Sequence, residues 1–217
     1  MEPSSRYIPA LRFAALTRIY DPVVALTTRE RTFKQRLIEQ AHLAPGLRVL
    51  DLACGSGTLA VWMKRAQPAI ELTAIDGDPA ILAQARAKAA RLGLPIDFRQ
   101  GLSTALPFEN ASFERVTSTL FFHHLQSPDK LKSFSEALRV LAPGGELHVA
   151  DWGAPSNPAM RAAFMGIRLL DGFANTAAHV AGRLPHMMRE AGFDDVRVHG
   201  GIDTLFGTMA LYSGRKA

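Results

Sequence analysis

Apolar residues recur along this chain in two alternating patterns. Short segments rich in apolar and β-branched residues, typical of strands, occur at 47–52, 70–75, 96–99, 113–119 and 145–150. Between them, apolar positions three and four residues apart predict helices at 58–67, 79–92 and 128–141. Strands that alternate with helices in this way predict an α/β fold, in which helices cover a mainly parallel sheet.

Turn and capping residues delimit these elements. Asp78-Pro79 and Ser127-Pro128 each place a capping side chain before a proline at the first helical position. Gly93 and the turn Pro143-Gly144-Gly145 end the second and third helices. These capping and turn residues therefore support the predicted order of strands and helices.

The flanking segments follow other patterns. Residues 8–43 have helical spacing with a break at Asp21-Pro22, which predicts two N-terminal helices. Beyond Asp151, the pattern predicts an apolar helical insert, a further helix and two closing strands, at 157–178, 181–191, 193–198 and 203–213. The short connection containing Gly200-Gly201 predicts that the last two strands form an antiparallel hairpin at a sheet edge.

The composition of the chain restricts the classes of protein to which it can belong. The chain has 217 residues and is 47% hydrophobic, enough for one buried core and a single domain. Its net charge of +5 is spread along the chain, which favours a solvated exterior over a nucleic-acid surface. The lone Cys54 excludes an internal disulfide, and no secretion signal or membrane-spanning run occurs. We expect a cytoplasmic protein without integral membrane association.

The first strand leads into a glycine-rich turn, Asp51-Leu52-Ala53-Cys54-Gly55-Ser56-Gly57, followed directly by a helix. Glycines there let the backbone approach a ligand, and a helix N-terminus favours negative charge. Asp76 follows about twenty residues later, where a carboxylate can accept hydrogen bonds from ribose hydroxyls. Gly55-x-Gly57-x-x-Ala60 also satisfies the dinucleotide-binding pattern, so two cofactor classes remain open at this point.

Further segments follow in a set order: Arg99–Phe108, Ser112–Val116, Phe122-His123-His124-Leu125 and Leu138–Gly145. Together with the glycine turn, residues 40–215 resemble the class I S-adenosylmethionine-dependent methyltransferases, in particular the small-molecule branch with quinone and sterol methyltransferases. The resemblance implies a Rossmann-like three-layer sandwich with a seven-stranded sheet. It also implies S-adenosyl-L-methionine as cofactor and S-adenosyl-L-homocysteine as product.

The resemblance also assigns roles to residues. Asp51 and the loop Ala53, Cys54, Gly55 and Gly57 match the segment under the methionine part of the cofactor, whereas Asp76 and Gly77 match the ribose site. Leu102 stands where the family commonly has an adenine-contacting Asp, so that contact passes to Ser103 or to the backbone. Thr119 would lie near the sulfonium, and Tyr20 matches a residue that reaches the cofactor carboxylate or the acceptor. Asp78 is better explained as a helix cap.

The acceptor side is less defined. His123 and His124 follow the fourth strand, and an imidazole there could take a proton from the acceptor. Trp152, Phe164, Arg168 and Phe173 are candidates for the acceptor pocket, although packing on the sheet explains each of them equally well. No His, Cys or Asp cluster has metal-ligand spacing, so no metal is expected.

The segments that characterise DNA-methylating enzymes are missing as well. Ser118-Thr119-Leu120-Phe121 replaces the motif of DNA amine methylation, and Cys54 lies in the cofactor loop, away from any cytosine-attacking position. The sequence thus predicts methyl transfer to a small, partly apolar acceptor and no DNA partner. It leaves the methylated atom and the oligomeric state open.

The predicted single domain comprises four segments: an N-terminal helical cap, a cofactor-binding core, a helical insert, and a C-terminal helix with the edge hairpin, at 1–45, 46–151, 152–180 and 181–217. Two alternatives remain. A scaffold protein could bind the cofactor without turnover, and an NAD(P)-dependent oxidoreductase could use the same glycine turn.

Overall fold

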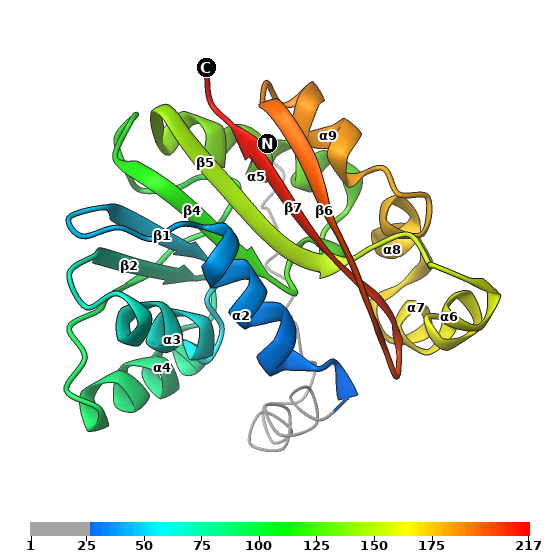
Figure 1. Cartoon of the computed structure of the whole chain (residues 1–217), viewed down its shortest axis with the longest axis horizontal. Coiled ribbons are helices and arrows are strands. Elements are labelled where there is room, and N and C mark those ends of the chain that lie inside the picture. The colour runs from blue at the N-terminus through cyan, green and yellow to red at the C-terminus, as the bar shows by residue number, and fades with distance from the viewer. Residues whose placement is uncertain (1–26) are drawn as a thin grey trace, which may run out of the picture.

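The computed structural model describes residues 27–217, and its centre is a seven-stranded sheet of order β3-β2-β1-β4-β5-β7-β6 (Figure 1). Strands β1 to β5 pair in parallel, whereas β7 is antiparallel to both β5 and β6. The predicted mainly parallel sheet with an antiparallel hairpin at one edge is confirmed. The strands are β1 Arg48–Leu52, β2 Glu71–Asp76, β3 Asp97–Gln100, β4 Phe113–Thr119, β5 Leu141–Trp152, β6 Asp194–Thr204 and β7 Gly207–Arg215.

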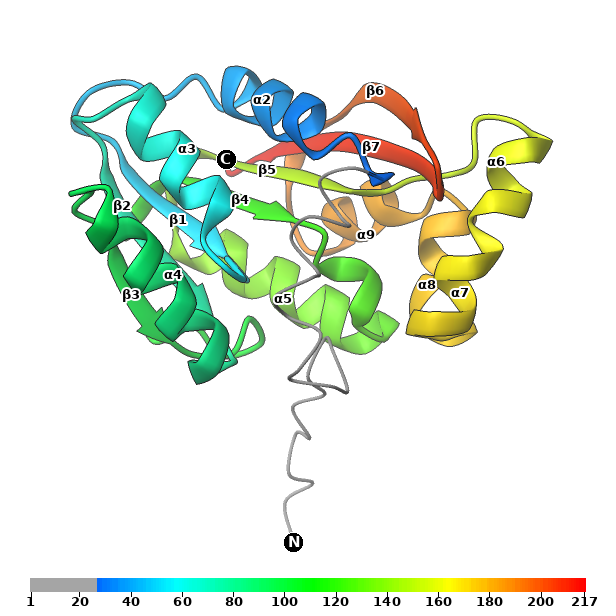
Figure 2. The ribbon, with the colours of Figure 1, turned by 90° about the horizontal axis from the view of Figure 1, so that it is seen from below.

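Helices cover both faces of the sheet, as the three-layer prediction requires. Buried side chains of α2, α3 and α4 belong to one apolar core, and those of α5 and α9 belong to another. Figure 2 shows α2 and α3 on one side of the sheet and α5 on the other. The helices are α2 Glu30–Gln40, α3 Thr58–Ala66, α4 Pro79–Arg91, α5 Ser127–Val140, α6 Pro158–Ala163, α7 Met165–Asp171, α8 Phe173–Val180, α9 Leu184–Glu190, and the 3₁₀ turn η2 Phe122–His124.

The two predicted helix caps differ in outcome. Asp78 caps α4 as expected, because its Oδ1 accepts hydrogen bonds from the N–H groups of Ala80 (2.8 Å) and Ile81 (3.4 Å). The predicted cap at Ser127 is wrong by one residue: Gln126 occupies the N-cap position of α5 and makes no side-chain capping bond. Proline in the first turn is enough to start this helix, since the N–H that it lacks has no helical partner there.

The hairpin turn is not at Gly200-Gly201. Strands β6 and β7 are joined at Leu205-Phe206, and the pairing of β6 with β7 shifts between Val198 and Gly201 instead. Gly200 has a φ of 94°, a left-handed conformation that here serves an irregularity inside a strand. The glycine pair therefore marks a bulge, which has the same sequence signature as a turn.

The predicted insert consists of three short helices in succession, α6, α7 and α8 (Figure 1). Asn157 caps α6 by accepting a hydrogen bond from the N–H of Met160 at 2.9 Å. Phe164 and Thr176 are buried, whereas Leu169 and Leu170 are 69% and 84% exposed. The insert thus packs on the body of the protein while it keeps apolar side chains at its surface.

Two predictions for the N-terminal segment fall outside the described residues, namely the first helix and the position of Tyr20. The second predicted helix corresponds to α2. No helix within residues 27–217 has both the length and the apolar character needed to cross a membrane.

We expect Gly57→Ala to lower the free energy of unfolding by about 2 to 4 kcal/mol. Gly57 has a φ of 75°, and a Cβ there would lie 2.9 Å from the Cβ of Ala85, so the variant combines backbone strain with overpacking. Gly93→Ala is the matched control: its φ is 63° but nothing lies within 4 Å, so strain alone should cost about 1 kcal/mol. Urea unfolding of both variants measures the difference, and equal losses would contradict the close packing of the β1–α3 turn against α4.

Candidate functional site

The turn between β1 and α3 curls back over the end of its own strand. Ala53, Gly55 and Gly57 all have positive φ, and the N–H of Gly57 donates to the carbonyl of Cys54 at 2.9 Å. Gly57 then forms the N-cap of α3. Burial raises the pKa of the Cys54 thiol well above its ordinary value, which makes Cys54 a poor nucleophile. The turn is therefore a backbone cradle at the start of a helix.

Asp51 lies beneath this turn and is almost fully buried. Its Oδ1 accepts a hydrogen bond from Thr117 Oγ1 at 3.2 Å, whereas its Oδ2 has no hydrogen-bond partner among the described residues. Burial raises the pKa of Asp51 to about 7, against the opposing charge of Lys34. An unpaired, buried carboxylate oxygen is costly, and a cationic or donor group of a ligand would relieve that cost.

Asp76 joins the glycine turn to the turn after β2. One carboxylate oxygen accepts the N–H of Gly55 at 2.9 Å and the other accepts the N–H of Asp78 at 3.0 Å. Burial raises its pKa, while these backbone hydrogen bonds lower it. Each oxygen keeps a second lone pair that could accept a hydrogen bond from a ligand hydroxyl.

The turn after β3 lies next to the end of β2. The N–H of Gly101 donates to the carbonyl of Asp76 at 3.0 Å, and Leu102 forms an isolated bridge with Ala105. The hydroxyl of Ser103 lies 2.8 Å from that of Ser133 on α5. Gly77 thus lies in the turn after β2, and Leu102 and Ser103 lie in the neighbouring turn after β3.

A network that the sequence did not predict centres on Asp151, near the end of β5. This side chain is fully buried, and its oxygens accept the N–H groups of Phe121 (3.1 Å) and Trp152 (2.7 Å). His123 Nδ1 lies 2.7 Å from Asp151 Oδ1. Burial alone would raise the pKa of Asp151, but the charges of His123 and His179 and these hydrogen bonds hold it well below its usual range.

A signal for Asp151 does exist in the sequence. Asp51, Asp76 and Asp151 each lie at the carboxyl end of a parallel strand, the edge at which open α/β sheets bind ligands. Gly55 follows Asp51 and Gly77 follows Asp76, and both segments belong to the motifs of the family resemblance. Gly153 follows Asp151 in the same way, but no further motif accompanies it, and its buried contacts distinguish it.

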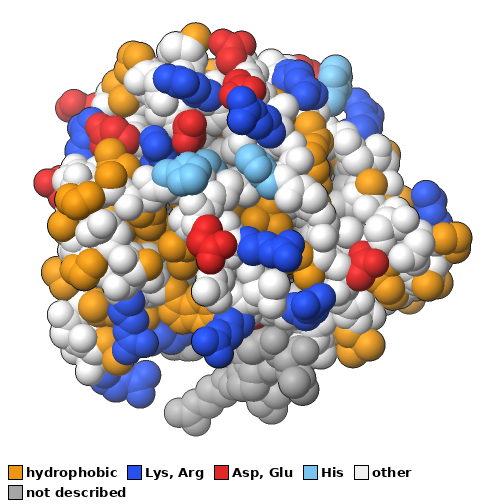
Figure 3. Space-filling model, viewed as in Figure 1, with side chains coloured by type: hydrophobic (Ala, Val, Ile, Leu, Met, Phe, Trp, Pro, Cys, Tyr) orange, Lys and Arg blue, Asp and Glu red, His pale blue; other side chains and the backbone are white. Residues whose placement is uncertain are grey.

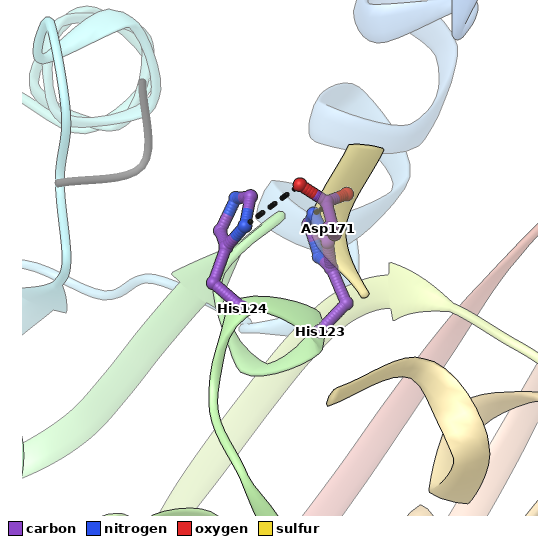
Figure 4. Close-up of side chains that lie close together, drawn as sticks. All are labelled: His123, His124 and Asp171. Carbon is purple, nitrogen blue, oxygen red and sulfur yellow. Dashed lines mark ion pairs between the residues drawn. The ribbon is translucent and has the colours of Figure 1, made fainter. Parts of the chain in front are cut away.

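His124 and His123 both approach Asp171, the last residue of α7 (Figure 4). His124 Nδ1 lies 3.3 Å from Asp171 Oδ1, and His123 Nε2 lies 3.7 Å from Asp171 Oδ2. Burial lowers the pKa of His124. Burial would raise that of Asp171, but the hydrogen bond to His124 and the histidine charges lower it. The insert thus contributes a carboxylate to the strand edge.

Two further buried side chains support this arrangement, and the sequence did not single them out. His179 on α8 has its Nδ1 2.7 Å from the carbonyl oxygen of Trp152, so Nδ1 carries the proton. Burial lowers the pKa of His179 to about 4. The ammonium of Lys130 donates to the carbonyls of Leu125 and of Asn175, the latter at 2.7 Å. Lys130 therefore ties the loop after η2 to α8.

The predicted pocket residues divide into two pairs. Trp152 and Phe164 are buried, with ring centroids 5.3 Å apart, and Trp152 also lies 6.3 Å from the His123 ring. Arg168 stacks on Phe173, its Cζ 4.5 Å from the ring centroid, and Phe173 is half exposed. The first pair therefore forms packed support beside His123. In the second pair Phe173 lies at the surface of the insert, while Arg168 is half-buried.

A separate hollow lies between α2 and the hairpin, where charged and histidine side chains gather (Figure 3). Its lining mixes both signs of charge and includes Arg36, Glu39, His148, Asp195, Arg197 and Arg215. It contains none of the predicted site residues. The candidate site is therefore at the carboxyl ends of β1, β2, β4 and β5, called the strand edge below, because turns and buried carboxylates lie together there.

Comparisons with known proteins agree with this geometry. Residues 49–145 match the family described as a methyltransferase domain. The chain is 37% identical over 123 residues to a demethylmenaquinone methyltransferase of Thermus thermophilus, a match that covers 57% of this chain and 55% of that protein. The chain thus spans little more than half of that relative's length.

A methyltransferase of a Synechocystis species is 32% identical over 178 residues, which covers 78% of this chain and 77% of the relative. Among solved structures, an S-adenosylmethionine-dependent methyltransferase from Aquifex aeolicus superposes with a TM-score of 0.69 at 18% identity, over 98% of this chain and 100% of that one. These matches decide against the nicotinamide-dependent alternative. The chain belongs to the class I S-adenosylmethionine-dependent methyltransferases, and its relatives group it with their small-molecule branch.

Proposed function

We propose that this protein transfers a methyl group from S-adenosylmethionine to a small hydroxylated ring compound with an apolar substituent, as in a quinol. The observation that carries the proposal is the buried His123–Asp151 contact, at the same sheet edge as Asp51 and Asp76. The name of the Thermus relative, a demethylmenaquinone methyltransferase, supports the acceptor class.

The residues at this edge fit the cofactor. The Oδ2 of Asp51, which has no hydrogen-bond partner within residues 27–217, suits the ammonium of a methionine moiety, and Asp76 suits ribose hydroxyls. Ala53 to Gly57 would run under the methionine part, Leu102 and Ser103 would border the adenine, and Thr119 would border the sulfonium. We also propose that Tyr20 contacts the cofactor or the acceptor, as the family resemblance implies; this residue lies outside the described part of the chain.

When bound, S-adenosylmethionine supplies a methyl group on a positively charged sulfur, so the leaving group is neutral. The protein then has to align the acceptor, exclude water and receive any proton that the acceptor loses. His123 and His124 are suited to hold the acceptor hydroxyl. Asp151 fixes the orientation of the His123 ring, so that Nε2 is turned toward Asp171 and the insert.

The insert provides the apolar side. Helix α7 ends in Asp171, which contacts His124, and the same helix carries the exposed Leu169 and Leu170. Phe173 follows at the start of α8 and is also exposed. We propose that these side chains receive the apolar substituent, while Trp152 and Phe164 support the ring site from beneath.

Asp76→Ala should weaken S-adenosylmethionine binding about 10- to 100-fold, because it removes a charged acceptor of ribose hydroxyls. Asp78→Ala is the matched control, two residues away. It removes only the cap of α4 and should lower the free energy of unfolding by about 1 kcal/mol, with cofactor affinity kept. Calorimetric titration and thermal unfolding measure both effects, and wild-type affinity in the Asp76 variant would refute the ribose assignment.

Cofactor affinity should fall as the pH is lowered through about 7. Below that pH the raised pKa leaves Asp51 protonated, and a neutral carboxyl cannot balance the ammonium of the ligand. The Asp51→Asn variant should bind the cofactor more weakly than the wild type at high pH, and its affinity should no longer fall where Asp51 of the wild type becomes protonated. Any pH dependence that comes from the cofactor's own ionisable groups should be the same in both proteins. Binding curves over a pH series test this point, and parallel pH profiles for the two proteins would rule out the Asp51 contact.

Turnover is measured as S-adenosylhomocysteine released in the presence of a demethylated naphthoquinol with a short prenyl chain. We expect turnover with this compound and a higher KM for the same ring without its chain. His123→Ala should lower kcat about a hundredfold or more at unchanged cofactor affinity. His186→Ala replaces an exposed histidine on α9 and should match the wild type. Tight cofactor binding without turnover on any hydroxylated ring would favour the scaffold alternative.

A further inference from the structure

Three side chains of the candidate site converge more closely than their sequence positions suggest. Among residues 27–217, His123, His124 and Asp171 bring a ring nitrogen each and a carboxylate oxygen within 4.8 Å of one another. Figure 4 shows the carboxylate of Asp171 beside both imidazole rings, whose centroids are 3.9 Å apart. The two histidines come from η2 after β4, and the carboxylate comes from the end of α7.

The separations between these side chains also leave room for a shared cation, because the His124–Asp171 hydrogen bond is long and the His123–Asp171 contact is longer still. A charge-assisted N–H···O bond spans about 2.7–2.9 Å, whereas the two His–Asp171 distances are 3.3 and 3.7 Å. Two ligand atoms that each lie about 2.1 Å from a tetrahedral ion are about 3.4 Å apart. A cation between these atoms would therefore need only small side-chain movements.

A second observation is independent of those distances. The other nitrogen of His123, Nδ1, lies 2.7 Å from the buried carboxylate of Asp151. A metal-binding histidine characteristically gives its second ring N–H to a carboxylate, which fixes the ring and leaves the opposite nitrogen free to coordinate. Asp151 is itself held by the N–H groups of Phe121 and Trp152, so the support behind His123 is rigid.

We propose that His123, His124 and Asp171 bind one divalent transition-metal cation of the zinc or iron(II) class. Imidazole and carboxylate ligands suit these ions, and two histidines with one carboxylate leave coordination positions open for an outside oxygen ligand. The sequence shows no such site, because adjacent histidines lack usual ligand spacing and Asp171 is far away along the chain.

The ion would do two things here. It would tie α7 of the insert to the end of β4, since its ligands come from both. It would also offer a Lewis-acidic position for the hydroxyl oxygen of the acceptor, in place of direct contacts from the two histidines, a role that rests on the proposed function. The metal site itself does not depend on that role.

The test uses the full chain, stripped with a chelator and titrated with Zn²⁺ alone by calorimetry, without cofactor or acceptor. We expect one equivalent to bind and to raise the unfolding temperature, since an ion that binds only the folded state stabilises it. Asp171→Asn keeps the shape of the side chain and should weaken binding at least tenfold, and so should His124→Ala. His186→Ala removes an exposed histidine and should bind like the wild type. Thermal unfolding of each metal-free variant verifies that it folds.

Substoichiometric binding would overturn the metal site, and so would equal affinity in wild type and in the folded Asp171→Asn protein. Loss of binding in His186→Ala alone would assign the ion to the surface and overturn it as well. The absorption of bound Co²⁺, which reports nitrogen and oxygen ligation, should change in His124→Ala.

Turnover separates the two proposals. Full activity in the chelated enzyme would overturn the Lewis-acid role and leave the methyl transfer intact. Stoichiometric metal binding without turnover on any acceptor would support the metal site and count against the proposed function.

Discussion

The Asp151 side chain has no contact with solvent, and a carboxylate in that position costs several kcal/mol unless donors surround it. Here three backbone N–H groups and the His123 ring do so. Those donors come from the segment after β4 and from β5 itself, so satisfying one buried charge sets the path of the chain above β4. The placement of η2, and with it that of both adjacent histidines, depends on this requirement.

The same edge of the sheet holds two other buried carboxylates with different environments. Asp76 is bound by backbone N–H groups of two turns, whereas Asp51 keeps an oxygen without a partner in the described part of the chain. Burial therefore raises the pKa of Asp51 to about 7, while the histidines lower that of Asp151. One of these carboxylates can still accept a hydrogen bond from a cationic ligand group, whereas Asp151 is already bound by donors of the protein itself. The proposed cofactor and acceptor sides follow this division.

Much of the fold could be predicted from local patterns. The segments predicted as strands at 70–75 and 113–119 match β2 and β4 within a residue, because their β-branched and apolar residues fit the surface of a buried sheet. Asp78 capped its helix as expected. The prediction of a hairpin turn at Gly200 was wrong, because a glycine with positive φ occurs both in strand bulges and in hairpin turns. A local sequence pattern therefore identifies a strand or a helix, but it does not show whether a glycine forms a bulge within a strand or a turn between two strands.

The sequence by itself determined the fold class and the clustering of the glycine turn, Asp51 and Asp76 at one end of the sheet, because all of them lie at the carboxyl ends of parallel strands. The partners of the histidine pair came only from the tertiary structure. Asp151 contacts His123 because η2 packs against the end of β5, and Asp171 contacts the histidines because α7 of the insert lies beside η2. Contacts between segments so far apart in the chain depend on how the helices pack, which no local spacing encodes.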